Sequence, residues 1–344
     1  MRKTAVVILN YNGKKFLQEF LPGVLLYSQI EAEVIVADNC STDDSVEFIR
    51  QYHPNVRVIQ NKSNGGFAKG YNEALSQINA DYYVLLNSDV EVTPNWIAPV
   101  IELMNNDNTI AACQPKILAF HNKVQFEYAG AAGGFIDKYG YPFCRGRIFD
   151  TFEADLGQYQ DTTEVHWATG ACLFVRSAAY HAIGGLDEDF FAHMEEIDLC
   201  WRLKNLGHKI MYTSGATVFH VGAGTLAKHN PRKTYLNFRN NLILLCKNHA
   251  HQFFWIKLLL RMTMDGIAGL KFLFSGDVLH FVAVIHAHLS FYKSFPSTLQ
   301  KRNQFKRQVQ NWSKSAIYDQ SIVIDYFIKG KSKFSELPKN KFIK

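Results

Sequence analysis

One acidic residue stands directly after a stretch of strand character, where a reaction could use it. Asn87-Ser88-Asp89 follows an apolar, partly aromatic run at 82–86 that is short enough to be a buried parallel strand. In open α/β sheets, ligands bind beyond the carboxyl ends of the strands. Asp89 could hold Mg²⁺ or Mn²⁺ against a phosphate there, because these cations take oxygen ligands. A plain strand-to-helix turn, with Thr93 as N-cap before Pro94, is the alternative interpretation.

A second group with catalytic potential is the acidic pair Glu195-Glu196. Leucines at 199, 203 and 206 recur at helical spacing, so a helix is predicted from Glu195 onward. Carboxylates in a first turn are favoured by the helix dipole, and the pair could serve that purpose alone. A carboxylate in a site can also act as a general base. Asp198 and Arg202, spaced i and i+4, are predicted to form a structural ion pair.

Alternating strands and helices must position these residues. The alternation implies βαβ units and a parallel sheet. Asp38 ends the second strand as Asp89 follows the fourth, and it could accept hydrogen bonds from a nucleobase or ribose, or only close an Asx turn. We expect strands at 4–9, 34–37, 56–59, 82–86, 110–114, 172–175, 209–212 and 217–219, and helices at 14–28, 41–52, 67–78, 94–104 and 235–248.

Two further stretches could meet phosphate. The glycine-rich segment at 64–72 enters a helix, where backbone N–H groups can cradle an anion, although a glycine turn without a ligand fits equally. It is not G-x-G-x-x-G, so a dinucleotide fold is not supported. Residues 116–165 are rich in glycine and aromatics and are predicted to form hairpins and a mobile loop over the site. Arg145 and Arg147 there could contact a diphosphate or be merely solvated.

Composition indicates a globular chain. Its 344 residues are 47% hydrophobic and 20% charged, with a mild net charge of +6. The cysteines show neither C-x-x-C nor zinc spacing, which favours reduced thiols in the cytosol. The apolar run at 5–9 is too short for a signal peptide.

The C-terminal region changes character after residue 250. The apolar segments 253–274 and 278–292 carry charges or are too short to span a bilayer. They fit two amphipathic helices in the membrane interface, a helical bundle, or a dimer interface. Residues 329–344 carry six lysines against one glutamate, so this tail is either solvated or placed on anionic lipid.

Four motifs, in order, resemble a known family. They are Val7-Ile8-Leu9-Asn10-Tyr11-Asn12-Gly13, Val36-Ala37-Asp38-Asn39-Cys40-Ser41-Thr42-Asp43, Asn64-x-Gly66-Phe67-Ala68-x-Gly70-x-Asn72 and Leu86-Asn87-Ser88-Asp89. Together they resemble family 2 of the inverting glycosyltransferases with the GT-A fold, over about residues 4–250. The nearest branch resembles rhamnosyl- and galactofuranosyltransferases of bacterial surface polysaccharides. Asn87 replaces the first aspartate of the family's D-x-D, and Glu196 replaces its usual aspartate.

The resemblance assigns roles to individual residues. Asp89 and His220 would bind the metal, and Glu196 would be the general base. The nucleotide-sugar would contact Asn10, Asp38, Asn64, Asn87 and Asp89. The acceptor side would include Trp167, Gly170, Asp187 and Glu195.

The expected protein is therefore an α/β glycosyltransferase. It would have a GT-A domain with a mostly parallel central sheet at 1–250 and a helical appendage at 251–344. With Mn²⁺ or Mg²⁺, it would move a sugar from a UDP- or dTDP-sugar to a hydroxyl of a glycan or lipid-linked acceptor at the cytoplasmic face of the membrane. A membrane surface and a second copy of the chain are open as partners, and nucleic acid is not expected. An inactive scaffold and a nucleotidyltransferase on a similar sheet are the alternatives.

Overall fold

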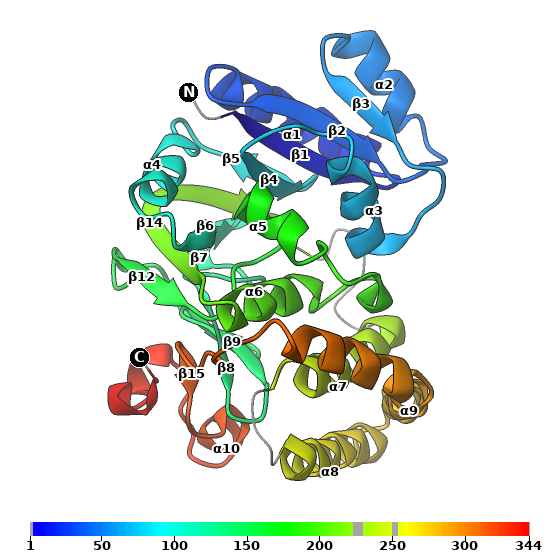
Figure 1. The fold of residues 1–344 in the computed structure, drawn as a ribbon, viewed down its shortest axis with the longest axis vertical. Helices are drawn as coiled ribbons and strands as arrows, with labels where there is room; N and C mark the ends of the chain where they lie inside the picture. The colour runs from blue at the N-terminus through cyan, green and yellow to red at the C-terminus, as the bar shows by residue number, and fades with distance from the viewer. Residues whose placement is uncertain (1–2, 223–229, 250–253, 344) are drawn as a thin grey trace.

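A computed structural model describes residues 3–222, 230–249 and 254–343 and builds them around a large central sheet (Figure 1). The strand order is β12-β14-β6-β13-β4-β1-β2-β3, with β5 added beside β14 and β7 beside β6. The first half alternates as expected: β1 (Thr4–Asn10), α1 (Lys14–Ser28), β2 (Glu33–Asp38), α2 (Ser45–Tyr52), β3 (Arg57–Gln60), α3 (Gly66–Leu75) and β4 (Tyr82–Asn87). These four strands are parallel.

Helices cover both faces of the sheet because its central strands are apolar on both sides. On β1, Val6 and Ile8 belong to a core cluster with Leu17 and Leu21 of α1. Their neighbour Val7 faces the opposite cluster with Tyr71 of α3. The two faces therefore hold separate cores, and the polar residues at the strand ends stay at one edge.

The sheet becomes mixed beyond β4. The remaining elements of this part are β5 (Val90–Val92), α4 (Ala98–Asn106), β6 (Ile110–Ala119), β7 (Asn122–Phe126), β12 (Thr162–Val165), β13 (Cys172–Arg176), α5 (Ser177–Ala182), α6 (Glu195–Asn205) and β14 (Lys209–His220). β13 runs antiparallel to both β4 and β6, so the parallel character is limited to the first four strands and to the β6–β14 pair.

Several predicted boundaries differ from the structure, among them the starts of the helices expected at 41–52 and 235–248, which begin at Ser45 and Pro231. The helix expected at 94–104 begins at Ala98, and the Thr93 hydroxyl donates to the Thr217 carbonyl instead of capping it. The strand expected at 110–114 continues to Ala119. The two strands expected at 209–219 are one strand, β14, with an irregularity between Thr213 and Thr217 that the sequence pattern showed as a break.

The stretch expected to hold a mobile loop forms a second sheet. Its strands are β8 (Gly134–Asp137), β9 (Pro142–Cys144), β10 (Arg147–Ile148) and β11 (Thr151–Phe152), with β15 (Ile317–Tyr318) added from far along the chain. The lysine-rich tail packs on the same sheet, since the rings of Phe334 and Phe342 lie 5.2 and 5.3 Å from that of Phe135. The lysines at 329, 333, 339 and 341 are exposed, so the choice between solvent and anionic lipid for this tail stays a prediction.

The remaining helices form a layer below the sheet (Figure 1). They are α7 (Pro231–Asn248), α8 (Phe254–Phe274), α9 (Val278–Lys306) and α10 (Ile322–Phe327). The charges within α8 are explained by a buried ion pair, in which Arg261 Nε lies 2.9 Å from Asp265 Oδ1. Arg261 also donates to Asn241 of α7. None of the described helices is both long and apolar enough to cross a membrane. The division expected at residue 250 stays a prediction.

Candidate active site

A single cavity of about 1940 Å³ lies beyond the carboxyl ends of β1 and β4 and reaches down to α8 and α10. Asn64, Asn87, Asp89, Trp167, Gly170, Glu195, Glu196 and His220 line it, which brings together most of the predicted site residues. Asn10, Asp38 and Asp187 are not among the lining residues.

Beyond the ends of β1 and β2, buried polar side chains form a hydrogen-bond network. Asn10 and Asp38 are register partners at the ends of β1 and β2, and Asn10 Nδ2 donates to Asp38 Oδ1 at 3.1 Å. The other Asp38 oxygen accepts from the Ser41 N–H at 3.0 Å. Asp38 therefore closes the turn after β2, as the alternative interpretation had it. Asn64 Oδ1 accepts from the Gly66 N–H at 3.0 Å and so shapes the entry to α3.

Asp89, Asn87 and His220 meet because β5 pairs with β14. His220 is the register partner of Val90, which places its ring beside Asp89. Nε2 of His220 lies 3.2 Å from Asp89 Oδ1 and 3.3 Å from the Asn87 amide nitrogen. Glu127 approaches the other ring nitrogen, with Oε2 at 3.3 Å from Nδ1. The sequence did not indicate Glu127, because it lies in a stretch with no motif.

The charges around this histidine reinforce one another. Burial opposes the charged form of His220, but Glu127 and Asp89 raise its pKa to about 10. Burial alone would raise the pKa of Asp89, yet its hydrogen bond with His220 holds that pKa below its usual value. The protonated, positively charged form of His220 is therefore favoured.

Asn87, Asp89 and His220 supply the kinds of ligand atom that a divalent cation requires. In the part of the chain that the structure describes, no three His, Cys, Asp or Glu side chains are grouped as metal ligands. Asp89 and His220 do face one another, with the Asn87 amide beside them. An amide oxygen, a carboxylate and an imidazole are a set that Mn²⁺ accepts. Glu127 on the far ring nitrogen resembles the carboxylate that commonly orients a metal-binding histidine.

A strained loop leads into α6, the helix that begins with Glu195 and Glu196. Phe191, His193 and Met194 all have positive φ values, of 63°, 69° and 74°. Such conformations persist only where the surroundings enforce them. The enforcing group is Asn240 of α7, whose Nδ2 lies 3.0, 2.8 and 2.7 Å from the carbonyl oxygens of Phe190, Ala192 and His193. In the sequence, Asn240 was only one member of the helix expected at 235–248.

Glu195 and Glu196 open α6 at the cavity wall. Burial and the neighbouring Glu196 charge raise the pKa of Glu195 well above its usual value. Burial also raises the pKa of Glu196 to about 7, although backbone N–H groups such as that of Gly170 lower it. One oxygen of each carboxyl group has no hydrogen-bond partner. A carboxylate with a pKa near neutrality is suited to accept a proton.

The acceptor-side predictions separate into two groups. Trp167 and Gly170 lie at the cavity, where the indole donates to the Phe135 carbonyl at 2.9 Å. Asp187 instead forms ion pairs with Lys247 and Lys301, at 2.5 and 2.6 Å. Both lysines hold the pKa of Asp187 far below its usual value against the effect of burial. Asp187 therefore belongs to the scaffold beneath α6, together with the confirmed Asp198–Arg202 pair.

The two arginines of the second sheet also differ. Arg145 pairs with Asp161 at 2.9 Å, and its guanidinium lies 4.7 Å from the Tyr212 ring centroid. It does not line the cavity. Arg147 does, and its guanidinium stacks 4.0 Å from the ring centroid of Tyr128. Both side chains are buried, so the solvated alternative was wrong.

Comparisons with known proteins agree with this geometry. A family model described as glycosyl transferase family 2 matches residues 5–184, more than half of the chain. An N-acetylglucosaminyl-diphospho-decaprenol L-rhamnosyltransferase of Mycobacterium tuberculosis is 26% identical over 284 residues. That alignment covers 77% of this chain and 90% of that protein.

Two solved structures share the fold. GalNAc-T7 with UDP, GalNAc and Mn²⁺ superposes with a TM-score of 0.56 at 15% identity, over 71% of this chain and 48% of that chain. The mannosyltransferase PcManGT of Pyrobaculum calidifontis, in complex with GDP-Man and Mn²⁺, gives 0.52 at 13% identity, over 85% and 87%. The family match, the mixed sheet with helices on both faces and the residues at its edge lead to one conclusion. The chain belongs to glycosyl transferase family 2 and is a glycosyltransferase with the GT-A fold.

Proposed function

We propose that this glycosyltransferase moves a sugar, with inversion, from a UDP- or dTDP-sugar to a hydroxyl of a lipid-linked or glycan acceptor. The observation that carries the proposal is the shared cavity, which holds both the Asp89–His220 pair and the Glu195–Glu196 pair. The Asp89–His220 pair is proposed to act at the leaving diphosphate, and the Glu195–Glu196 pair at the attacking hydroxyl. The related rhamnosyltransferase, which acts on a diphospho-decaprenol, supports this class of acceptor.

Glu196 is the proposed general base of a single displacement. The acceptor oxygen attacks the anomeric carbon from the face opposite the nucleotide, and the bond from that carbon to the phosphate oxygen breaks. The hydroxyl proton passes to the Glu196 carboxylate as the new bond forms. A pKa of about 7 keeps much of this group ionised at neutral pH while leaving it basic enough to take the proton.

Asn87, Asp89 and His220 are the proposed ligands of a divalent cation, Mn²⁺ or Mg²⁺. When bound, the cation would neutralise charge on the departing nucleoside diphosphate. An imidazole ligand favours Mn²⁺ over Mg²⁺. Glu127 would orient His220 from behind. Asn10 and Asp38, at the ends of β1 and β2, and Asn64, after β3, are the proposed contacts of base and ribose.

The apolar face of α8, α9 and α10 is the proposed contact with the inner leaflet of the cytoplasmic membrane. Phe274, Leu279 and Ile328 are 85%, 70% and 77% exposed. Ile267 and Phe327 are exposed on the same elements and also line the cavity, so the cavity opens onto this face. A second copy seated there would cover the opening, whereas a bilayer would supply an acceptor through it.

Calorimetric titration of UDP and dTDP, each with and without Mn²⁺, tests the nucleotide site. Wild type should bind one of them in a metal-dependent manner, and Asp89→Ala should abolish that dependence. The exposed Asp44→Ala, which does not line the cavity, is the matched control. Binding of neither nucleotide under any condition would refute the transferase mechanism and favour an inactive scaffold.

A further inference from the structure

The cavity contains a basic residue, Arg147, that has no part in the proposed donor site. Arg147 of β10 is only 8% exposed. One of its terminal nitrogens donates to the Phe149 carbonyl at 3.0 Å, but its Nε has no hydrogen-bond partner. Among the described residues, no carboxylate lies within 4.0 Å of it as an ion-pair partner, although the negative charge of Glu127 acts on it from farther away. A buried guanidinium left in this state is costly unless an anion completes its contacts.

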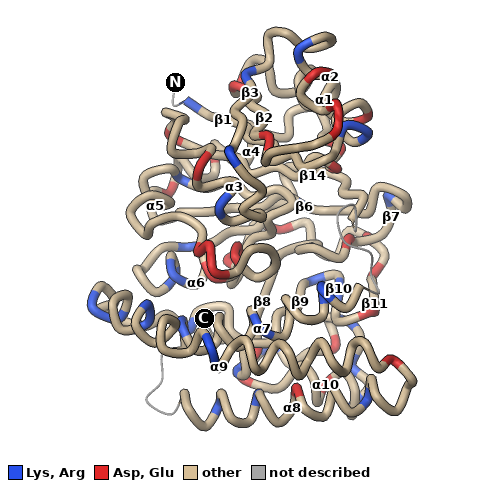
Figure 2. Tube along the Cα trace, turned by 90° about the vertical axis from the view of Figure 1, so that its right-hand side faces the viewer, with Lys and Arg blue, Asp and Glu red and all other residues tan. Residues whose placement is uncertain are grey.

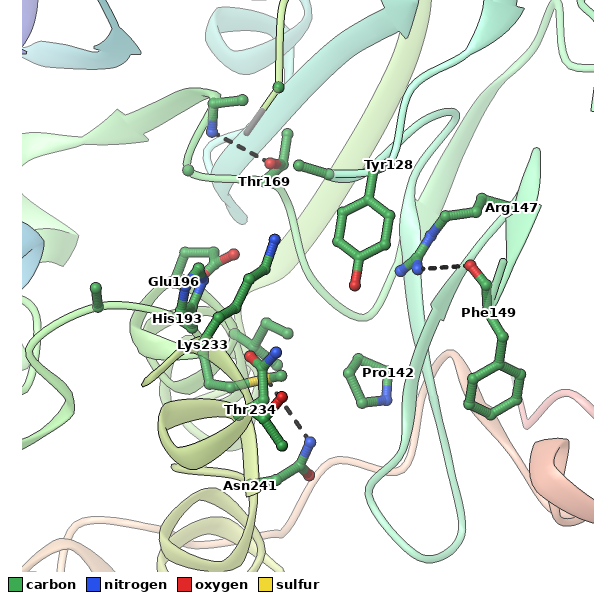
Figure 3. A pocket seen from close by; sticks show the side chains of 18 of the residues that line it. Tyr128, Pro142, Arg147, Phe149, Thr169, His193, Glu196, Lys233, Thr234 and Asn241 are labelled. Atoms are coloured by element: carbon green, nitrogen blue, oxygen red, sulfur yellow. Dashed lines mark hydrogen bonds between the residues drawn. The ribbon is translucent and has the colours of Figure 1, made fainter. Parts of the chain in front are cut away.

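A second cation approaches the same ring from the opposite wall. Lys233 lies in the first turn of α7, and its Nζ is 5.1 Å from the ring centroid of Tyr128. Lys233 also lacks an ion pair with any described carboxylate. Arg147 and Lys233 therefore flank one tyrosine, and neither has an ion-pair partner among the described carboxylates, although they come from segments about 90 residues apart. Figure 3 shows both side chains reaching into the cavity, with the Tyr128 hydroxyl between the two walls.

This basic group lies between the reaction centre and the apolar opening. Tyr128 directly follows Glu127, which contacts His220. Across the cavity, Lys233 lies on the same side as Glu196 and His193 (Figure 3). Figure 2 shows acidic residues beside α6 and basic residues beside β10, with basic residues also near α6 and acidic ones near β11. The lining also includes the apolar side chains of Pro142, Phe149, Phe272, Phe327 and Ile328, and among them Lys271 Nζ lies 5.1 Å from the ring centroid of Phe327.

A ligand that matches the order of these surroundings along the cavity has a hydroxyl-bearing sugar, then an anion, then an apolar chain. We propose that Tyr128, Arg147 and Lys233 form a second anion subsite that holds the phosphate or diphosphate of a lipid-linked acceptor. The inference rests on the proposed function, because it assigns the acceptor to the same cavity. It also narrows that function, since a neutral glycan would leave both cations unpaired. The proposed binding site of the donor diphosphate is the Asp89–His220 end of the cavity.

The subsite can be tested without knowing the sugar. Farnesyl diphosphate, inorganic pyrophosphate and farnesol are each titrated into the full chain in EDTA, so that no metal site competes. Wild type should bind farnesyl diphosphate more tightly than the other two. Lys233→Gln and Arg147→Gln should each weaken that binding about tenfold or more, as expected for loss of a charge-assisted hydrogen bond. Lys306→Gln, an exposed change on α9, should leave it unaltered.

Three outcomes would overturn the subsite. One is farnesyl diphosphate binding that is unaffected by both variants. Another is its displacement by UDP in EDTA, which would place it in the nucleotide site. The third is pyrophosphate binding as tightly as farnesyl diphosphate, which would indicate a site for free anions. Because Lys233 is only half-buried, its variant remains informative if Arg147→Gln does not fold.

The same preparations separate this inference from the proposed function. UDP and dTDP titrations with Mn²⁺ report on the donor site alone. If nucleotides fail to bind while farnesyl diphosphate binds and responds to the variants, the proposed function fails and the subsite stands. If nucleotides bind normally while both variants leave farnesyl diphosphate binding unchanged, the subsite fails and the proposed function stands.

Discussion

Replacing Asn240 with alanine should release the loop that positions the catalytic helix. The Asn240 amide is buried and within hydrogen-bond distance of three carbonyl oxygens, but it has only two N–H groups, so one of them is shared. Two such bonds contribute roughly 1–3 kcal/mol together. A central value of about 2 kcal/mol corresponds to roughly a 30-fold shift toward a relaxed loop.

The loop is expected to relax because its conformation is costly. Phe191, His193 and Met194 occupy a backbone region that costs a non-glycine residue on the order of 1–3 kcal/mol. Once relaxed, the loop no longer holds Glu196 against the cavity wall. We expect kcat to fall about 10- to 100-fold. The acidic limb of the pH–rate profile should also move from about 7 toward the ordinary value of 4.5, as the carboxyl group gains water.

The assay is donor turnover as a function of pH, with water or an acceptor as the nucleophile. Nucleotide affinity in the presence of Mn²⁺ serves as the test of folding, because that site lies on other elements. Asn303→Ala, an exposed asparagine on α9, is the control. An unchanged kcat with an unchanged acidic limb would show that the loop keeps its conformation without Asn240, and the reasoning would be wrong.

The remaining predictions concern the acidic pair, the scaffold and the apolar face. Glu196→Gln should lower turnover about 10²- to 10⁴-fold and remove the acidic limb near pH 7, and turnover close to wild type would exclude it as the base. Because burial raises the pKa of both Glu195 and Glu196 in the folded chain, the stability linked to their protonated forms is present below about 4.5 and is lost as pH rises through about 7. Glu195→Gln should therefore raise the denaturant midpoint at pH 8 more than at pH 5, and equal shifts would contradict this. Asp187→Asn leaves the buried charge of Lys247 uncompensated, so it should destabilise the fold by about 3–5 kcal/mol in thermal melts without changing nucleotide affinity. A loss of nucleotide affinity without a loss of stability would contradict this. Phe274→Ser combined with Leu279→Ser should reduce flotation with anionic liposomes, whereas an effect on self-association alone would indicate a second copy as the partner.

The first half of the fold was predictable because its signals are local. β1 and β4 are continuous apolar runs, and each ends in the polar residue that later lines or supports the site. Because parallel strands all end at the same edge of the sheet, the sequence alone was enough to place Asn87 and Asp89 at a ligand site. The family resemblance then added His220 and Glu196, which no local pattern could connect to the strand ends.

What escaped prediction depends on contacts between distant segments. Glu127 acts on His220 from across the β6–β14 pair, and no spacing in the sequence relates the two. Arg147 looks like a surface arginine until the second sheet buries it. The family resemblance placed Asp187 on the acceptor side, yet in the structure it forms ion pairs with lysines of α7 and α9. Each of these outcomes is set by tertiary packing rather than by propensity.

The second sheet has a consequence for how the protein becomes active during synthesis. β15 pairs with β8 across about 180 residues, and the Ile322 N–H donates to Asp137 over the same span. The ring of Phe334 closes the stack over Phe135 and Phe143. The proposed donor site extends from Asn10 to His220 and needs no residue beyond β14, so it can form while translation continues. The wall that carries Arg147 must wait until residues beyond 317 have left the ribosome, so a nascent chain would acquire donor binding before it acquires the acceptor chamber.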